Sequence, residues 1–224
     1  MKLVSSFCLA VGLTLLTGIS NAALVFTFEN EGVQTSTVGN ITTEDFEGSL
    51  NNIGTLTGGS ILSADMYGGA GGVGKYLFAY NSDPATLVLN TDANYLGLWW
   101  SAGDAANNLA FYDASNNLLG EYSSTALSGL ASGYYGNPTP NFLGQNSGEA
   151  YAYLNFTVTG GTAAIHRVVF GGSNFEIDNV SVTADKITPP GNSTDVPDAS
   201  CTLLMMGSAI LSLGAVRAGL KKKA

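Results

Sequence analysis

Carboxylates are the most numerous side chains of this sequence that could do chemistry. The chain of 224 residues holds 17 Asp and Glu against eight Lys and Arg and a single His. Glu44, Asp45 and Glu47 lie in one short segment. Glu149 and Glu176 lie near two later strands. Two carboxylates at a suitable separation are enough for glycoside hydrolysis. The sequence alone does not bring any two of them together, so we assign no catalytic residue and keep a carbohydrate-active hydrolase as an alternative.

Glu47 and Asp178 are candidate ligands of one structural calcium ion. Calcium binds about six to eight oxygen atoms, so two carboxylates would need backbone carbonyl partners. Phe175 and Ile177 share one face of a predicted strand, whereas strict alternation puts Val180 on the other face. A β-bulge near Asp178 would return Val180 to the core side and expose backbone oxygens. The alternative is that Asp178 accepts hydrogen bonds from nearby backbone amides. We expect no other cofactor.

Two further patterns resemble functional signatures without completing them. Residues 69–75 match the first seven positions of a phosphate-binding loop, but Tyr76 replaces the Ser or Thr that binds magnesium. His166 is the only histidine, and the two cysteines, Cys8 and Cys201, lie in the apolar ends of the chain. A catalytic triad or a histidine-based zinc site would need partners that this sequence does not provide. We therefore expect a protein without enzymatic activity.

Aromatic residues suggest a surface that binds carbohydrate. Side chains alternate across a strand, so Leu96, Leu98 and Trp100 share one face. These three are suited to the core, which predicts that Trp99 and Tyr95 face solvent. Exposed aromatic rings can stack on sugar rings, and the candidates are Trp99, Tyr134, Tyr135, Tyr151 and Tyr153. The alternative is that these tyrosines cover the second sheet or a loop.

Alternation with a period of two dominates the middle of the chain and predicts β-strands. The segments with strand character are residues 24–29, 76–80, 95–100, 108–113, 118–122, 150–159, 165–170 and 175–182. None has a convincing helical period, and 29 glycines with frequent Asn and Ser separate short strands. These features predict an all-β fold, a two-sheet antiparallel β-sandwich or jelly roll.

The two ends of the chain have the composition of export and membrane signals. Lys2 precedes an apolar stretch at residues 3–19 and a small-residue site at residues 20–22, which predicts a signal helix cleaved after residue 22. Residues 199–216 carry no charge over a length close to that of a transmembrane helix. A basic stop follows, formed by Arg217, Lys221, Lys222 and Lys223, and it predicts a cytoplasmic C-terminus.

These boundaries divide the chain into four segments. Residues 1–22 are the predicted signal peptide, 23–184 the β-sandwich ectodomain, 185–198 a linker rich in Pro, Gly and Ser, and 199–224 the tail with the transmembrane helix. Between the two ends, 17 acidic residues face three basic ones, which gives this part a charge of −14. Such a charge argues against nucleic acid and anionic lipid as partners. The membrane contact that we expect is made by the tail.

The tail and several internal motifs resemble one known family. Val196, Pro197 and Asp198 precede the apolar run. The internal motifs lie at residues 67–72, 96–104, 134–138 and 175–182. Together they resemble exosortase-dependent surface proteins of the PEP-CTERM class, in the variant with a Val-Pro-Asp-Ser-Gly signal. The resemblance implies a β-sandwich without an assigned reaction, with signal peptidase and exosortase as partners during export. It also implies delivery to the cell surface or extracellular matrix of a Gram-negative bacterium.

We therefore expect an exported, non-enzymatic protein that passes through the inner membrane to the cell surface or matrix. A lectin-like module of the exopolysaccharide matrix is the first alternative, and the hydrolase is the second. The sequence leaves open whether the tail is cleaved or kept as an anchor.

Overall fold

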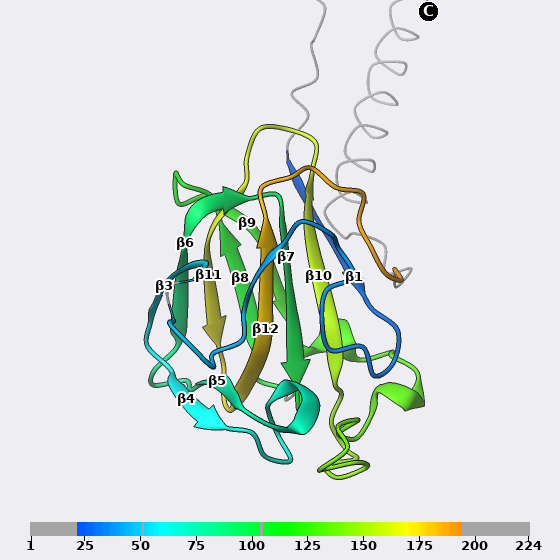
Figure 1. Cartoon of the computed structure of the whole chain (residues 1–224). Coiled ribbons are helices and arrows are strands. Elements are labelled where there is room, and N and C mark those ends of the chain that lie inside the picture. Colours follow the sequence, from blue (N-terminus) through cyan, green and yellow to red (C-terminus); the bar gives the residue numbers. More distant parts are fainter. Residues whose placement is uncertain (1–21, 51, 104, 194–224) are drawn as a thin grey trace, which may run out of the picture. The chain divides into compact units, whose positions relative to one another are not determined.

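The computed structural model describes residues 22–50, 52–103 and 105–193, and strands dominate this part of the chain (Figure 1). The strands are β1 (Ala23–Phe28), β2 (Thr42–Glu44), β3 (Gly54–Thr57), β4 (Ser60–Ser63), β5 (Lys75–Ala79), β6 (Ala85–Ala93), β7 (Tyr95–Ser101), β8 (Asn108–Tyr112), β9 (Leu118–Ser123), β10 (Ala152–Thr159), β11 (Ile165–Gly171) and β12 (Phe175–Thr183). Short 3-10 turns occur at Ala70–Gly72, Ser124–Leu127 and Ser132–Tyr134.

All the predicted strand segments contain a strand, whereas β2, β3, β4 and β6 were not predicted. The first three are only three or four residues long, too short to display a period. β6 does bury Leu87 and Leu89, but its second half contains the polar residues Asn90 and Asp92, which obscure the alternation.

The strands form two antiparallel sheets, which confirms the predicted all-β class with two sheets. The larger sheet has the order β1-β10-β7-β12-β5-β4, with β2 paired to β12. The smaller sheet has the order β3-β6-β11-β8-β9. The front layer in Figure 1 is the larger sheet, and the smaller sheet lies behind it.

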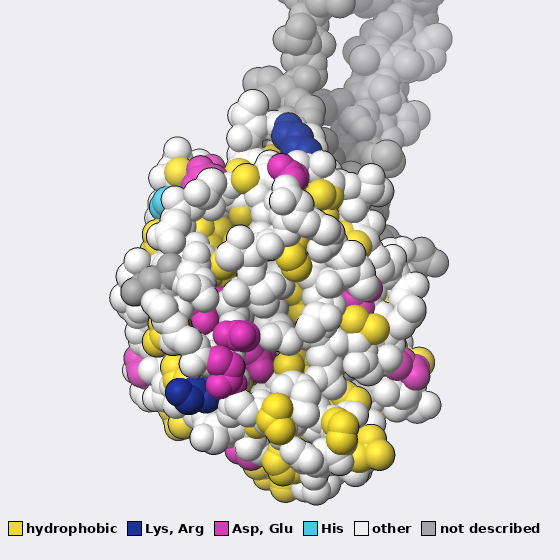
Figure 2. All heavy atoms as spheres, viewed as in Figure 1, with side chains coloured by type: hydrophobic (Ala, Val, Ile, Leu, Met, Phe, Trp, Pro, Cys, Tyr) yellow, Lys and Arg dark blue, Asp and Glu magenta, His cyan; other side chains and the backbone are white. Residues whose placement is uncertain are grey.

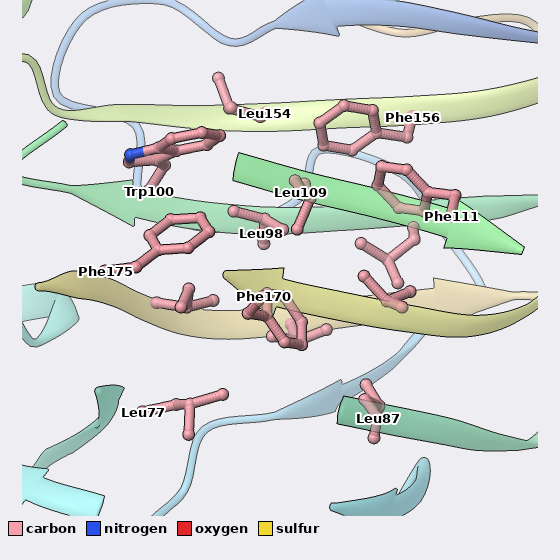
Figure 3. Close-up of a cluster of buried hydrophobic side chains, with 14 of the residues drawn as sticks. Leu77, Leu87, Leu98, Trp100, Leu109, Phe111, Leu154, Phe156, Phe170 and Phe175 are labelled. Atoms are coloured by element: carbon pink, nitrogen blue, oxygen red, sulfur yellow. The ribbon is translucent and has the colours of Figure 1, made fainter. Parts of the chain in front are cut away.

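Apolar side chains from both sheets meet in one core (Figure 3). The larger sheet contributes Leu98, Trp100 and Phe156, and the smaller sheet contributes Phe111 and Phe170. The rings of Phe111 and Phe156 lie 4.5 Å apart across the two layers. Burying one such side chain contributes about 1.5–3 kcal/mol, so this interface between the sheets is the main source of stability. The predicted core face of β7 is confirmed, since Leu98 and Trp100 are fully buried.

A bulge interrupts β12 where the sequence predicted one. The register between β12 and β7 shifts between Asp178 and Ser181. Asn179 adopts a positive φ of 47°, a conformation that Asn tolerates better than most residues. The shift brings Val180 back to the core, while Asp178 points to the opposite face of the sheet.

Over β7 and β10 the outer face of the larger sheet is covered by loops rather than exposed to water. The hydroxyl groups of Tyr95 and Ser36 form a hydrogen bond of 2.7 Å, so the segment between β1 and β2 lies over β7. Ala70, from the glycine-rich loop before β5, packs on a second cluster of buried side chains that includes Trp99 and Tyr153. Loops thus form a third layer above this sheet.

The segment after β12 also lies against the sandwich. Asn40 donates to Asp185 at 2.6 Å, and Thr27 of β1 donates to the carbonyl of Pro190. The compact unit of the chain extends to Gly191, whereas the predicted ectodomain ends at residue 184. No helix within the described residues is long and apolar enough to cross a membrane. The predicted signal helix, sorting motif, transmembrane helix and basic stop lie outside residues 22–193 and are not described.

Candidate functional site

A pocket of about 390 Å³ opens on the outer face of the larger sheet. Its position follows from alternation, because Leu77 and Ile177 point into the core and their neighbours Tyr76, Phe78 and Glu176 must point outward. The loop before β5 and the loop before β10 complete the wall. The volume lies in the range of pockets that hold small ligands, about 300–1,000 Å³.

Aromatic rings make up much of the pocket. Tyr67 is 45 % exposed and Tyr80 is 40 % exposed, so both rings are available to a ligand. Phe78 meets Tyr80 edge to face, with ring centroids 4.3 Å apart, and Tyr76 is buried. Sequence reasoning did not select these residues, although a signal was present. Tyr76, Phe78 and Tyr80 follow each other at a spacing of two, which places three rings on one face of a strand.

Three carboxylates, those of Asp65, Glu149 and Glu176, line the same pocket. Glu176 of β12 lies opposite Phe78 of β5 and Ser101 of β7 and is buried. Asp65 accepts hydrogen bonds from the amides of Tyr67 and Gly68 at 2.8 and 3.0 Å.

These charges raise the pKa values of two buried tyrosines, Tyr76 and Tyr151. The pKa of the Tyr76 hydroxyl is raised by burial first and then by the charges of Asp65 and Glu176. Burial is again the largest cause of the raised pKa of Tyr151, and the charges of Glu149, Glu176 and Asp65 add to it, against a hydrogen bond from Asn146. Glu149 and Glu176, which the sequence could not pair, line the same pocket in the structure.

A second acidic group consists of Asp178 with Asp45 and Glu47, whose charges act on it. Figure 2 shows that Asp and Glu side chains gather in a cluster on one face of the molecule. Asp178 is only 3 % exposed. Its two oxygens accept hydrogen bonds from the amides of Ala70 at 2.7 Å and Asn179 at 2.6 Å. Burial raises the pKa of Asp178 from 3.8 to about 7, the two amides oppose this shift, and the charges of Asp45 and Glu47 add to it. The hydrogen bond from the Asn179 amide confirms the predicted alternative of a local backbone partner, whereas the second amide, that of Ala70, lies 108 residues away in the chain.

The calcium ligands predicted from the sequence lie on the same side of the molecule. Glu47 accepts a hydrogen bond from the amide of Lys75, and its charge reaches Asp178. Among residues 22–50, 52–103 and 105–193, no group of three or more His, Cys, Asp and Glu side chains is arranged to hold a metal ion. Calcium at Glu47 and Asp178 stays a prediction, which would need backbone oxygens to complete the shell.

The glycine-rich loop directs its amides at side chains of the same protein. The amide of Ala70 donates to Asp178, that of Gly71 to Gln34, and that of Lys75 to Glu47. The segment that follows is strand β5, as predicted, and not the helix of a phosphate-binding loop.

The aromatic residues predicted to bind carbohydrate do not form an exposed platform. The prediction that Trp99 and Tyr95 face solvent is wrong, because both are buried beneath the loops described above. Tyr134, Tyr151 and Tyr153 are buried as well. Their hydroxyls donate to the carbonyls of Glu29, Met66 and Asn179, respectively, at 2.8, 2.7 and 3.1 Å. Of the predicted set, Tyr135 is exposed, at 39 %, and it does not line the pocket.

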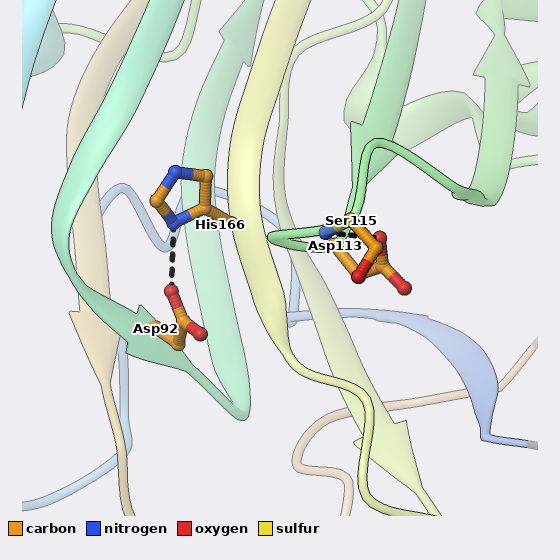
Figure 4. A network of polar contacts seen from close by, with 4 residues as sticks. All are labelled: Asp92, Asp113, Ser115 and His166. Carbon is orange, nitrogen blue, oxygen red and sulfur yellow. Dashed lines mark hydrogen bonds and ion pairs between the residues drawn. The ribbon is translucent and has the colours of Figure 1, made fainter.

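His166 lies on the outer face of the smaller sheet. Its Nδ1 is 2.7 Å from Oδ1 of Asp92 (Figure 4). Ser115 and Asp113, drawn in the same view, form a separate turn in which Asp113 accepts a hydrogen bond from the Ser115 amide. In the described part of the chain, no hydroxyl group donates to His166, so the Asp–His pair lacks the nucleophile of a triad.

Comparison of the chain with known protein families, curated proteins and solved structures finds no match. The site therefore has to be interpreted from its own geometry.

Proposed function

We propose that this protein is an exported, non-enzymatic protein of the cell surface or extracellular matrix that binds carbohydrate in the pocket on its larger sheet. The observation that carries the proposal is the combination of exposed Tyr67 and Tyr80 rings with carboxylates beneath them. Aromatic rings stack on the apolar faces of sugars, and carboxylates accept hydrogen bonds from their hydroxyls. The side chains for both kinds of contact line one pocket.

The export route in this proposal is supported by the sequence. A signal helix at residues 1–22 is removed by signal peptidase, and exosortase recognises Val196, Pro197 and Asp198 ahead of the transmembrane helix. The two sheets are compatible with a jelly roll. An extracellular location also suits a pocket for polysaccharide.

Binding of glycans by the full chain tests the proposal. A glycan array identifies the ligand, and titration calorimetry then compares the wild type with Tyr67→Ala and Tyr80→Ala. Each variant is expected to weaken binding by about two- to twelvefold, since stacking on one ring contributes about 0.5–1.5 kcal/mol. Tyr135→Ala is the matched control, because Tyr135 is equally exposed but lies outside the pocket. Equal losses in all three variants would contradict the pocket as the binding site.

A carbohydrate-active hydrolase is the second candidate, because three carboxylates converge on one pocket. Two carboxylates flanking a glycosidic bond could act as acid and base or as acid and nucleophile. Release of reducing sugar that Glu176→Gln abolishes without weakening glycan binding would favour this candidate over a pure binding module.

A further inference from the structure

The two sheets of the sandwich meet differently at their two sides. At one side, the edge strands β1 and β9 lie against each other, since the Tyr122 hydroxyl of β9 donates to the Leu24 carbonyl of β1 at 2.8 Å. At the other side, the edge strands are β3 of the smaller sheet and β4 of the larger one. β3 pairs with β6, and no strand in the described part of the chain pairs with its other side. β3 is therefore an open edge.

The backbone groups of Leu56 point out of this edge. The Ile53 carbonyl accepts a hydrogen bond from the Asn90 amide at 3.0 Å, so it faces β6. Successive residues of a strand direct their backbone groups to opposite sides. Thr55 and Thr57 therefore also bond to β6, whereas the N–H and C=O of Leu56 face away from it. Such a pair of open groups is a template for a further antiparallel strand.

β3 lacks the features that keep an open edge from pairing. Natural edge strands are protected by charged side chains, by Pro or by a bulge. Residues 48–64 include no Asp, Glu, Lys, Arg or Pro, and the register between β3 and β6 is regular. The exported part of the chain carries a charge of −14, so two copies repel each other over most of their surface. A neutral edge is where they can touch with the least repulsion.

The side chains of β3 are complementary to a second copy of the same strand. Thr55, Leu56 and Thr57 read the same in both directions. In an antiparallel pair of β3 strands about a twofold axis at Leu56, the two Leu56 residues bond to each other, and each Thr55 lies opposite a Thr57. Both threonines are exposed on the outer face, and Leu56 packs against the core. Opposed threonines stabilise neighbouring strands, and the two leucines would join the cores.

We propose that β3 is a self-association surface, through which two copies of this chain join their smaller sheets into one continuous antiparallel sheet. The contact is isologous, because the same strand serves on both sides. β3 has four residues, so the dimer belongs to the weak class that buries less than about 1,200 Å². The high local concentration at the proposed cell-surface location favours it. The contact does not involve the pocket or its ligand.

Sedimentation velocity of the full chain in a mild detergent, over a range of protein concentrations, tests the proposal. We expect the wild type to shift from one chain to two as the concentration rises. Thr55→Lys combined with Thr57→Lys places like charges opposite each other twice and should weaken the dimer by about tenfold or more. Thr55→Lys combined with Thr57→Glu places opposite charges at the same two points and should keep the dimer within about threefold of the wild type. Both positions are exposed, and melting temperatures check that each variant is folded.

The matched control for added charge is Gln145→Lys combined with Ser147→Lys, in the exposed loop before β10, which should associate like the wild type. A wild type that stays monomeric over the whole range would overturn the proposal. Equal association of the wild type and the double-lysine variant of β3 would place the contact elsewhere and would also overturn it. If the Lys–Glu combination fails to recover what the double-lysine variant loses, the antiparallel pairing of β3 with itself is wrong.

Discussion

Replacing Asp178 by Asn should remove a large part of the pH dependence of stability. Asp178 is held in the β12 bulge, almost fully buried, with two amide hydrogen bonds and no cationic partner among the described residues. The pKa of about 7 means that the folded protein binds a proton more tightly than the unfolded chain, in which the pKa is close to 3.8. The stabilisation from this proton is complete below pH 3.8 and is lost as the pH rises through 7.

The size of the effect follows from the two pKa values. The full difference corresponds to about 4 kcal/mol. About half of it, ~2 kcal/mol, falls between pH 5.5 and pH 8, where most other carboxylates do not titrate. The wild type should therefore lose about 2 kcal/mol of unfolding free energy over this interval. Asp178→Asn, which cannot ionise, should lose much less.

Urea denaturation at pH 5.5 and pH 8, with EDTA present to remove divalent cations, measures both unfolding free energies. Asn loses one of the acceptors that Asp178 offers to the two amides, so the change with pH is compared and not the absolute stability. Asp83→Asn, in the exposed turn before β6, is the matched control and should follow the wild type. Parallel pH profiles for the wild type and Asp178→Asn would refute the argument that a buried, uncompensated charge forms at high pH.

Three further predictions concern the fold, metal binding and processing. Gly97→Ala should destabilise by about 1–3 kcal/mol in urea denaturation, because the new methyl group would collide with Tyr95 and lie 2.7 Å from Tyr153. Gly129→Ala, with no atom within 4 Å, should change stability by less than about 0.5 kcal/mol. Millimolar calcium should raise the melting temperature above an ionic-strength control, and the rise should vanish in Asp178→Ala; no rise would exclude the predicted site. Mass spectrometry of surface-extracted protein should show a chain from about residue 23 to about residue 198, and a retained basic stop would contradict exosortase processing.

Much of the fold was predictable from local alternation. The strands from β7 to β12 follow the period-two pattern, and the bulge at Asp178 was visible as a break in it. Each of these features depends on residues that are neighbours in sequence. The pocket was partly predictable in the same way, since the spacing of Tyr76, Phe78 and Tyr80 already placed three rings on one side of β5.

The wrong prediction for Trp99 shows where local patterns stop being sufficient. Alternation correctly separated Trp99 from the core face of β7, but it does not tell whether the opposite face meets water or another layer. That decision depends on the loops, which bring Ala70 and Ser36 over the sheet from positions about 30 and 60 residues earlier in the chain.

By itself, the sequence determined the strand-rich class, the face of each long strand that enters the core, the acidic surface and the expectation of export. These properties depend on composition and on spacing along a few residues. Only the tertiary structure decided which carboxylates meet, because Asp65, Glu149 and Glu176 come from segments far apart in the chain. It also decided that most of the predicted sugar-binding rings are buried, because covering the outer face of the larger sheet removes their apolar surface from water while their hydroxyls keep carbonyl partners.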